Sequence, residues 1–291
     1  MKKVDDEMRH DTISANAPGS GSHPFITVVG VGYYPRHITM EAICELEKAD
    51  IVIGHESLLS TLSAYIPEGA LRISDPVLRE TTSNIESLKK ERVMQVIDYA
   101  QKGNRVVYVC PGDPGIYSYA QPILEYSASI PVKIIPGITA VLVAAAALGA
   151  PLRDGCALIG LYEERIDPEI IRKRVSAAIQ SDFVIVFYLP KHEALLYPEF
   201  YPEDLYPELY PRESKCSERL VHAFDELLRV RSPETPMGIL CIKGENELIT
   251  TTLGEYKEVL GDILPYSTII IGNSMSKYTG PYFVTSLWRT P

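Results

Sequence analysis

Three short loops rich in glycine and proline carry the residues best suited to bind a small ligand. They occupy residues 29–35 (VGVGYYP), 111–117 (PGDPGIY) and 136–140 (PGITA). Each follows a run of apolar, β-branched residues that is typical of a buried strand. Glycine lets the backbone approach a ligand closely, and strand-end amides and carbonyls face the crevice where open α/β sheets bind ligands. The chemistry expected here is recognition of a small molecule, mainly by main-chain atoms.

Each loop, taken alone, also fits an ordinary tight turn. The first lacks the full G-x-G-x-x-G pattern, and Asp50 begins the second strand where a dinucleotide fold needs an acid at the strand's end. Asp113 is either part of a ligand loop or the cap of the helix that follows. Thr139 is open to the same two interpretations.

The sequence indicates neither a metal centre nor a disulfide framework. No two of the five cysteines form a C-x-x-C pair, and the six histidines form no H-E-x-x-H cluster. Scattered, odd-numbered cysteines are typical of reduced thiols in a cytoplasmic protein. His37 and His55 follow strand ends and could face the crevice, but a structural role is the simpler interpretation of each. The cysteines are Cys44, Cys110, Cys156, Cys216 and Cys241.

Strands alternate with amphipathic helices around these loops, which predicts an α/β fold with a mostly parallel N-terminal sheet. Thr39 is the expected N-cap of the first helix. Strands are expected at 25–32, 50–54, 104–110, 132–135, 156–161, 183–189, 237–242, 248–253 and 267–272, and the C-terminal sheet is expected to be mixed. Helices are expected at 84–102, 117–127, 139–149, 167–180 and 217–229.

Composition bounds the organisation of the chain and its partners. The 291 residues allow two α/β domains, which we place at 25–140 and 141–291. A formal net charge of −10 argues against binding to nucleic acid or to anionic membranes. Residues 1–24 have the composition of a disordered tail, and 197–211 carry four Tyr-Pro pairs that predict an irregular surface loop.

The order and spacing of the three loops resemble the tetrapyrrole (corrin/porphyrin) methylase family. Members share a strand followed by G-x-G, a G-D-P-x-x-Y loop and a P-G-I-[ST] loop. The resemblance runs from about residue 25 to residue 288 and is nearest to the precorrin-3B C-17 methyltransferase group. The segments that carry this closer likeness are 167–175 (DPEIIRKRV), 187–190 (FYLP), 235–239 (TPMGI) and 271–274 (IGNS).

The resemblance implies a homodimer of two-domain α/β chains that binds S-adenosylmethionine between the domains and releases S-adenosylhomocysteine. By position it implies that Asp113 is the main residue that aligns the reactants. The implied cofactor contacts are Tyr33, Pro111, Gly112, Asp113, Ile116, Thr139, Ala140, Leu189 and Lys243. The implied activity is C-methylation of a precorrin or cobalt-precorrin in cobalamin biosynthesis, with C-17 as the expected position.

Two departures from the family pattern keep other functions open. The first loop has Tyr33 and Tyr34 where the family usually has Pro-Gly, and residues 160–168 differ from the usual C-17 group sequence. A non-catalytic cofactor- or tetrapyrrole-binding relative, or a methyltransferase for a protein substrate such as the diphthine synthases, are the alternatives. An acidic macrocycle would need cations, and the candidates are Arg36, Arg153, Arg165, Arg172 and Lys191.

Overall fold

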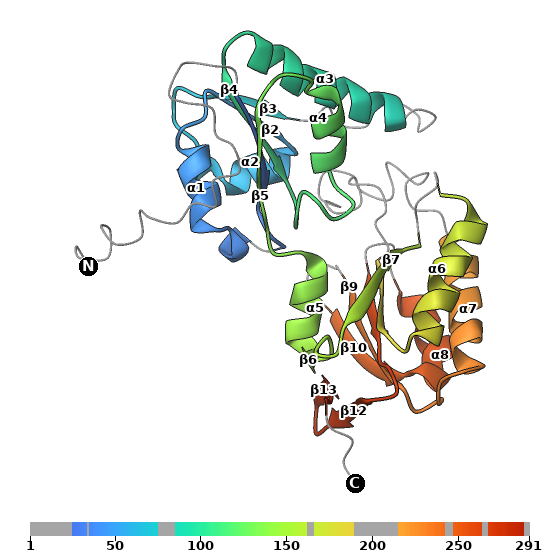
Figure 1. Cartoon of the computed structure of the whole chain (residues 1–291). Coiled ribbons are helices and arrows are strands. Elements are labelled where there is room, and N and C mark those ends of the chain that lie inside the picture. Colours follow the sequence, from blue (N-terminus) through green and yellow to red (C-terminus); the bar gives the residue numbers. More distant parts are fainter. Residues whose placement is uncertain are drawn as a thin grey trace.

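The structure is a computed structural model of the chain. It describes residues 25–33, 35–74, 85–161, 166–188, 215–241, 247–263 and 267–287. The predicted tail at 1–24 and the Tyr-Pro loop at 197–211 lie outside the described residues, as do Arg165, Leu189, Lys191 and Lys243. The described part consists of two α/β units, one above the other in Figure 1.

The N-terminal unit contains a five-stranded sheet with the order β3-β2-β4-β1-β5, and every pair in it is parallel. The predicted parallel sheet is therefore confirmed. Parallel pairing brings the carboxyl ends of β1, β4 and β5 to one edge, where the three glycine-containing loops begin. The strands are β1 (Phe25–Gly30), β2 (Ile51–Gly54), β3 (Leu71–Ser74), β4 (Arg105–Cys110) and β5 (Val132–Ile135).

Helices cover both faces of this sheet. On one face, α3 and α4 enclose a cluster that includes Val28, Val96 and Ile123. On the other face, α1 and α2 enclose Leu46 and Leu59. Burial on both faces explains why the strands read as nearly continuous apolar runs. The helices are α1 (Met40–Leu46), α2 (Glu56–Thr61), α3 (Ile85–Gln101) and α4 (Ala120–Tyr126), with the 3-10 turns η1 (Pro35–His37) and η2 (Ser63–Tyr65).

The C-terminal unit is built on a mixed sheet with the order β10-β9-β11-β8-β7. Its β7–β8 pair is parallel, whereas the other pairs are antiparallel, as the mixed pattern predicted. A smaller sheet, β12-β13-β6, lies beside it. The strands are β6 (Gly149–Ala150), β7 (Cys156–Gly160), β8 (Val184–Tyr188), β9 (Pro236–Cys241), β10 (Glu247–Thr252), β11 (Thr268–Ile271), β12 (Ser276–Thr279) and β13 (Tyr282–Thr285).

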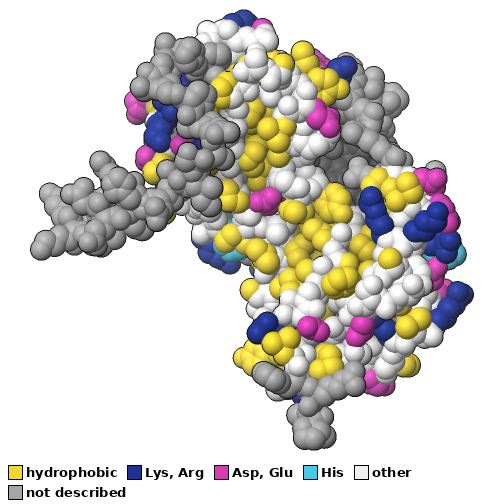
Figure 2. Space-filling model, in the orientation of Figure 1, with side chains coloured by type: hydrophobic (Ala, Val, Ile, Leu, Met, Phe, Trp, Pro, Cys, Tyr) yellow, Lys and Arg dark blue, Asp and Glu magenta, His cyan; other side chains and the backbone are white. Residues whose placement is uncertain are grey.

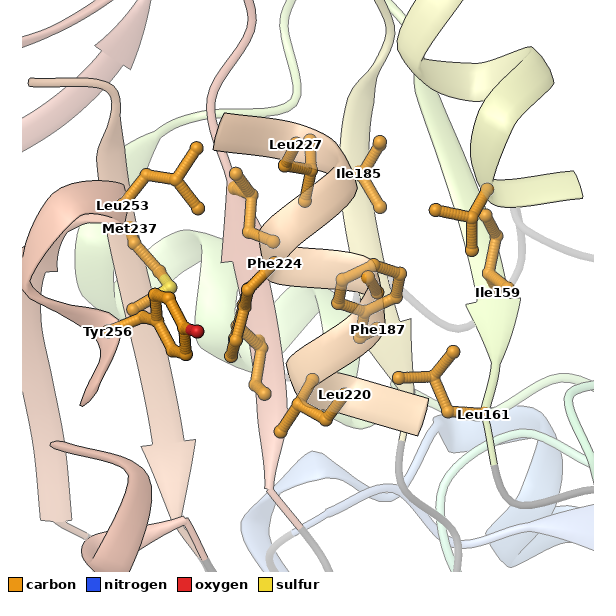
Figure 3. Close-up of a cluster of buried hydrophobic side chains, with 14 of the residues drawn as sticks. Ile159, Leu161, Ile185, Phe187, Leu220, Phe224, Leu227, Met237, Leu253 and Tyr256 are labelled. Atoms are coloured by element: carbon orange, nitrogen blue, oxygen red, sulfur yellow. The ribbon is translucent and has the colours of Figure 1, made fainter. Parts of the chain in front are cut away.

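Helices again flank this sheet, with α5 on one side and α6 and α7 on the other (Figure 1). Phe224 of α7 packs between Phe187 and Tyr256, with ring centroids 6.3 and 4.7 Å away (Figure 3). These three rings are fully buried and form the centre of the C-terminal core. The remaining elements are α5 (Ala140–Leu148), α6 (Pro168–Gln180), α7 (Lys215–Leu228), η5 (Leu253–Glu255), α8 (Tyr256–Val259) and η6 (Leu260–Asp262).

Local signals placed several element boundaries. Thr39 is the N-cap of α1, and its hydroxyl accepts a hydrogen bond from Ala42 N at 3.1 Å, as expected. The helix expected from residue 117 begins only at Ala120, because Tyr117 has a left-handed backbone with φ of +52°. Within the described ranges, no helix combines the length and the apolar character that crossing a bilayer requires.

Candidate functional site

The three loops predicted to bind a ligand meet at the carboxyl edge of the N-terminal sheet. Gly32 and Gly112 exchange two backbone hydrogen bonds, of 3.2 Å from Gly32 N to Gly112 O and 2.9 Å from Gly112 N to Gly32 O. A Cβ atom on Gly30 would lie 2.6 Å from Gly112 O and 2.7 Å from Gly137 N. Such distances are available only to glycine, so the sequence lets the backbones of three strand ends touch.

Asp113 joins two of these loops through its carboxylate. Oδ1 accepts a hydrogen bond from Gly115 N at 2.8 Å, within its own loop. Oδ2 accepts one from Gly137 N at 3.1 Å, in the loop after β5. The carboxylate does not cap α4, whose N-cap is Tyr119. Asp113 therefore acts in the folded protein as a tie between the second and third loops.

Thr139 and Ala140 begin α5 directly beyond this tie. Thr139 occupies the N-cap position of α5, but its hydroxyl makes no capping hydrogen bond. The interpretation that the Thr139 side chain caps this helix is therefore wrong. Its Oγ1 atom is buried beside the Tyr188 hydroxyl and makes no hydrogen bond of normal geometry with the described residues. A Cβ atom on Gly112 would lie 3.7 Å from the Thr139 Cα atom. The second and third loops are thus in van der Waals proximity, as the predicted site requires.

The other predicted contacts that the structure describes lie on the same edge. Pro111 and Ile116 are half-buried on either side of Asp113. Tyr33 is half-buried and packs against the apolar cluster of the C-terminal unit, so the first loop bridges the two units. Leu189 directly follows Tyr188 of β8, and Lys243 follows β9 two residues after Cys241, but neither is within the described residues.

A second aromatic contact across the units was not assigned from the sequence. The hydroxyl of Tyr117 accepts a hydrogen bond from Gly160 N at 2.6 Å. Its ring stacks on Tyr188, with centroids 5.5 Å apart and planes 19° from parallel. Tyr117 belongs to the G-D-P-x-x-Y loop, so the motif contained the signal, but nothing in the sequence identified its partners 43 and 71 positions away.

The histidines and the candidate cations differ in burial and in the partners of their side chains. Burial, and then the charge of Arg36, lowers the pKa of His37, which lies against Gly32. His55 is buried and serves as the N-cap of α2, accepting from Ser57 N at 3.3 Å. Arg172 forms an ion pair with Glu169 at 2.7 Å on the exposed face of α6. This arrangement identifies His55 and Arg172 as structural residues.

Two further candidate cations, Arg36 and Arg153, are exposed to solvent. The space-filling view shows hydrophobic side chains gathered across the middle of one face and Lys and Arg side chains along one edge of the lower unit (Figure 2).

Burial raises the pKa of the Tyr188 phenol, so its hydroxyl remains protonated beside Thr139. Among the described residues, the site is thus built from main-chain atoms, the hydroxyls of Thr139 and Tyr188, and the carboxylate of Asp113.

Comparison with known proteins identifies the group to which this architecture belongs. The family of tetrapyrrole (corrin/porphyrin) methylases matches residues 26–211, which include all three loops. The chain belongs to the tetrapyrrole methylases. Its relatives in this family are named as methyltransferases of cobalamin biosynthesis, and it is accordingly a methyltransferase.

Two curated tetrapyrrole methylases show the extent of the similarity. The chain is 32% identical over 255 residues to a probable cobalt-factor III C(17)-methyltransferase of Salmonella typhimurium, which covers 85% of this chain and 92% of that protein. It is 26% identical over 275 residues to the cobalt-factor III methyltransferase of Priestia megaterium, but this match spans only 44% of that longer protein.

Solved structures of tetrapyrrole methylases share the fold. The methyltransferase CobJ aligns with a TM-score of 0.69 and 24% identity, over 90% of this chain and 99% of that one. A uroporphyrin-III C-methyltransferase from Thermus thermophilus, solved with S-adenosylhomocysteine, aligns with a TM-score of 0.56 and 18% identity over 85% of this chain and 96% of that one. At these identities the likeness concerns the fold alone.

Proposed function

We propose that this chain is an S-adenosylmethionine-dependent C-methyltransferase that methylates a precorrin or cobalt-precorrin at C-17. The observation that carries the proposal is the convergence of Gly32, Gly112, Asp113 and Gly137 at one sheet edge, in a chain that belongs to the tetrapyrrole methylases. The choice of C-17 rests on the name of the Salmonella relative, a probable cobalt-factor III C(17)-methyltransferase.

The residues at this edge fit a nucleoside cofactor held mainly by the backbone. Glycine at 30 and 137 lets the three loops pack backbone against backbone, which gathers their main-chain atoms at one edge. The Thr139 Oγ1 atom there is a buried polar atom with hydrogen-bonding capacity to spare. Pro111, Ile116 and Ala140 would supply apolar contacts. Tyr33, Leu189 and Lys243 complete the proposed contact set, with the last two assigned by the family pattern.

Bound S-adenosylmethionine would supply an electrophilic methyl group on a sulfonium, so the chain needs no nucleophile of its own. The task of its residues is to hold donor and acceptor in line and to exclude water, which is a large part of the rate in such transfers. Asp113 does this indirectly by locking the second and third loops together.

Titration calorimetry with S-adenosylmethionine and S-adenosylhomocysteine tests the first half of the proposal, and absence of binding to both would remove it. The second half is tested by incubating the full chain with cobalt-free and cobalt-bound precorrins and labelled donor, then locating the label by mass spectrometry. Label at C-17 supports the proposal. Binding without transfer to any tetrapyrrole would favour a non-catalytic relative, and label on a protein would favour the diphthine synthase type.

We also propose that the protein works as a cytoplasmic homodimer. The proposal rests on the family pattern and on cysteines spaced as reduced thiols. Light scattering after gel filtration should give twice the chain mass of 32.4 kDa. A mass of one chain at micromolar concentration would contradict it.

A further inference from the structure

Tyr117 has a backbone conformation that bulky side chains rarely adopt. Its φ of +52° lies in the left-handed region, where the Cβ atom crowds the following carbonyl oxygen. A non-glycine residue remains in this region only when surrounding contacts stabilise it. The contacts of Tyr117 therefore indicate what holds this loop in its conformation.

The first contact is the hydrogen bond from Gly160 N to the Tyr117 hydroxyl, at 2.6 Å. Gly160 ends β7, the edge strand of the C-terminal sheet. The next amide, Leu161 N, already donates to Tyr188 O on β8, so the N–H of Gly160 points toward the open edge. The phenol thus provides the acceptor for a buried amide that the sheet itself leaves without one.

The second contact is the stacking of the Tyr117 ring on Tyr188, the residue paired with Gly160 across the β7–β8 ladder. A Cβ atom on residue 160 would lie 2.8 Å from the Cε1 and Cζ atoms of this ring. The ring can occupy its place only because residue 160 is glycine. Both contacts join the loop after β4 to the ends of β7 and β8.

We propose, on the basis of the proposed function, that Tyr117 is a positioning residue that fixes the spacing of the two sheets across the site. Asp113 ties the loop after β4 to the N-terminal unit, and Tyr117, four residues later, ties the same loop to the C-terminal unit. One short loop therefore links two places. One is the carboxyl edge of the N-terminal sheet, where we propose that the methyl donor binds, and the other is the ends of β7 and β8, which precede residues 162–165 and Leu189 in the sequence. Methyl transfer depends on alignment to within a fraction of an ångström, so loosening this link lowers the rate more than the affinity.

The test compares Tyr117→Phe with Tyr126→Phe in the full-length protein. Phenylalanine keeps the stacked ring but removes the acceptor, whereas Tyr126 lies exposed on α4 and serves as the matched control. We expect hydrogen exchange at the Gly160 amide to be about tenfold faster in Tyr117→Phe, as for loss of one hydrogen bond to a buried donor. We expect kcat to fall about tenfold or more, with the KM for the methyl donor changed by less than about threefold.

A second variant separates the loop conformation from its contacts. Tyr117→Asn retains a residue that tolerates the left-handed region but removes both the ring and the phenol. We expect it to lose at least as much kcat as Tyr117→Phe. Unchanged exchange at Gly160, or faster exchange with kcat unchanged in both variants, would overturn the positioning role. If the wild-type protein binds no S-adenosylhomocysteine, the proposed function fails, whereas the exchange result still decides whether Tyr117 couples the two sheets.

Discussion

The Oδ2 atom of Asp113 accepts a hydrogen bond from Gly137 N at 3.1 Å, so one carboxylate links the loop after β4 to the loop after β5. Asp113→Ala removes this bond and the one from Gly115 N. Charge-assisted hydrogen bonds contribute about 1.5–3 kcal/mol each, so we expect the affinity for S-adenosylhomocysteine to fall at least tenfold. Calorimetry measures this loss. Asp98→Ala is the control, because Asp98 pairs with Lys102 on the exposed side of α3. This variant should bind S-adenosylhomocysteine with wild-type affinity. Wild-type affinity in Asp113→Ala would contradict the structural role assigned to the carboxylate.

Gly137 lies where no side chain fits, because a Cβ atom would be 2.0 Å from Gly112 O. In Gly137→Ala the second and third loops must therefore separate. We expect loss of detectable S-adenosylhomocysteine binding and a lower thermal midpoint, since backbone rather than a flexible side chain has to move. Differential scanning fluorimetry with and without ligand measures both effects.

Gly261→Ala is the matched control, because a Cβ atom there meets nothing within 4 Å. It should leave both ligand binding and the thermal midpoint close to the wild-type values. If Gly137→Ala behaved like Gly261→Ala, the close contact between the loops would be wrong.

His37 should make the first loop sensitive to acid. Burial and the Arg36 charge lower its pKa from the ordinary 6.5, so the folded protein binds fewer protons than the unfolded chain near pH 6. Its contribution to stability is present above pH 6.5 and is lost as the pH falls through the lowered pKa. We expect the free energy of unfolding, measured in urea, to fall between pH 7 and pH 5 by less in His37→Gln than in the wild type.

His222→Gln provides the comparison, because His222 is exposed on α7. It should follow the wild-type pH dependence. An identical pH dependence in all three proteins would show that His37 does not contribute.

Phe224 should dominate the stability of the C-terminal unit. It is fully buried between Phe187 and Tyr256, so Phe224→Ala leaves a large cavity (Figure 3). We expect a loss of about 3–5 kcal/mol in the free energy of unfolding, measured by urea denaturation. Phe183→Ala, at a ring that is 41% exposed, should cost about 1 kcal/mol or less. Equal costs would argue against the packing described.

The sequence by itself determined the elements whose signals are local. The apolar run at 132–135 is β5, the Thr39 hydroxyl caps α1, and the glycine-containing loops follow the strands that the pattern placed before them. The motif order also identified the family. By contrast, β3 was missed because it is an edge strand whose residues Leu71, Arg72 and Ser74 are exposed, which leaves no apolar run to detect.

Only the tertiary structure decided how the loop residues are used. Asp113 and Thr139 each had a helix-capping interpretation. The Asp113 carboxylate instead accepts a hydrogen bond from the loop after β5, and the Thr139 hydroxyl is buried beside Tyr188 of β8. The left-handed Tyr117 and its fit against Gly160 depend on residues 43 positions apart. Local propensity and periodicity report on a few successive residues, whereas these contacts exist only after two sheets have brought their strand ends together.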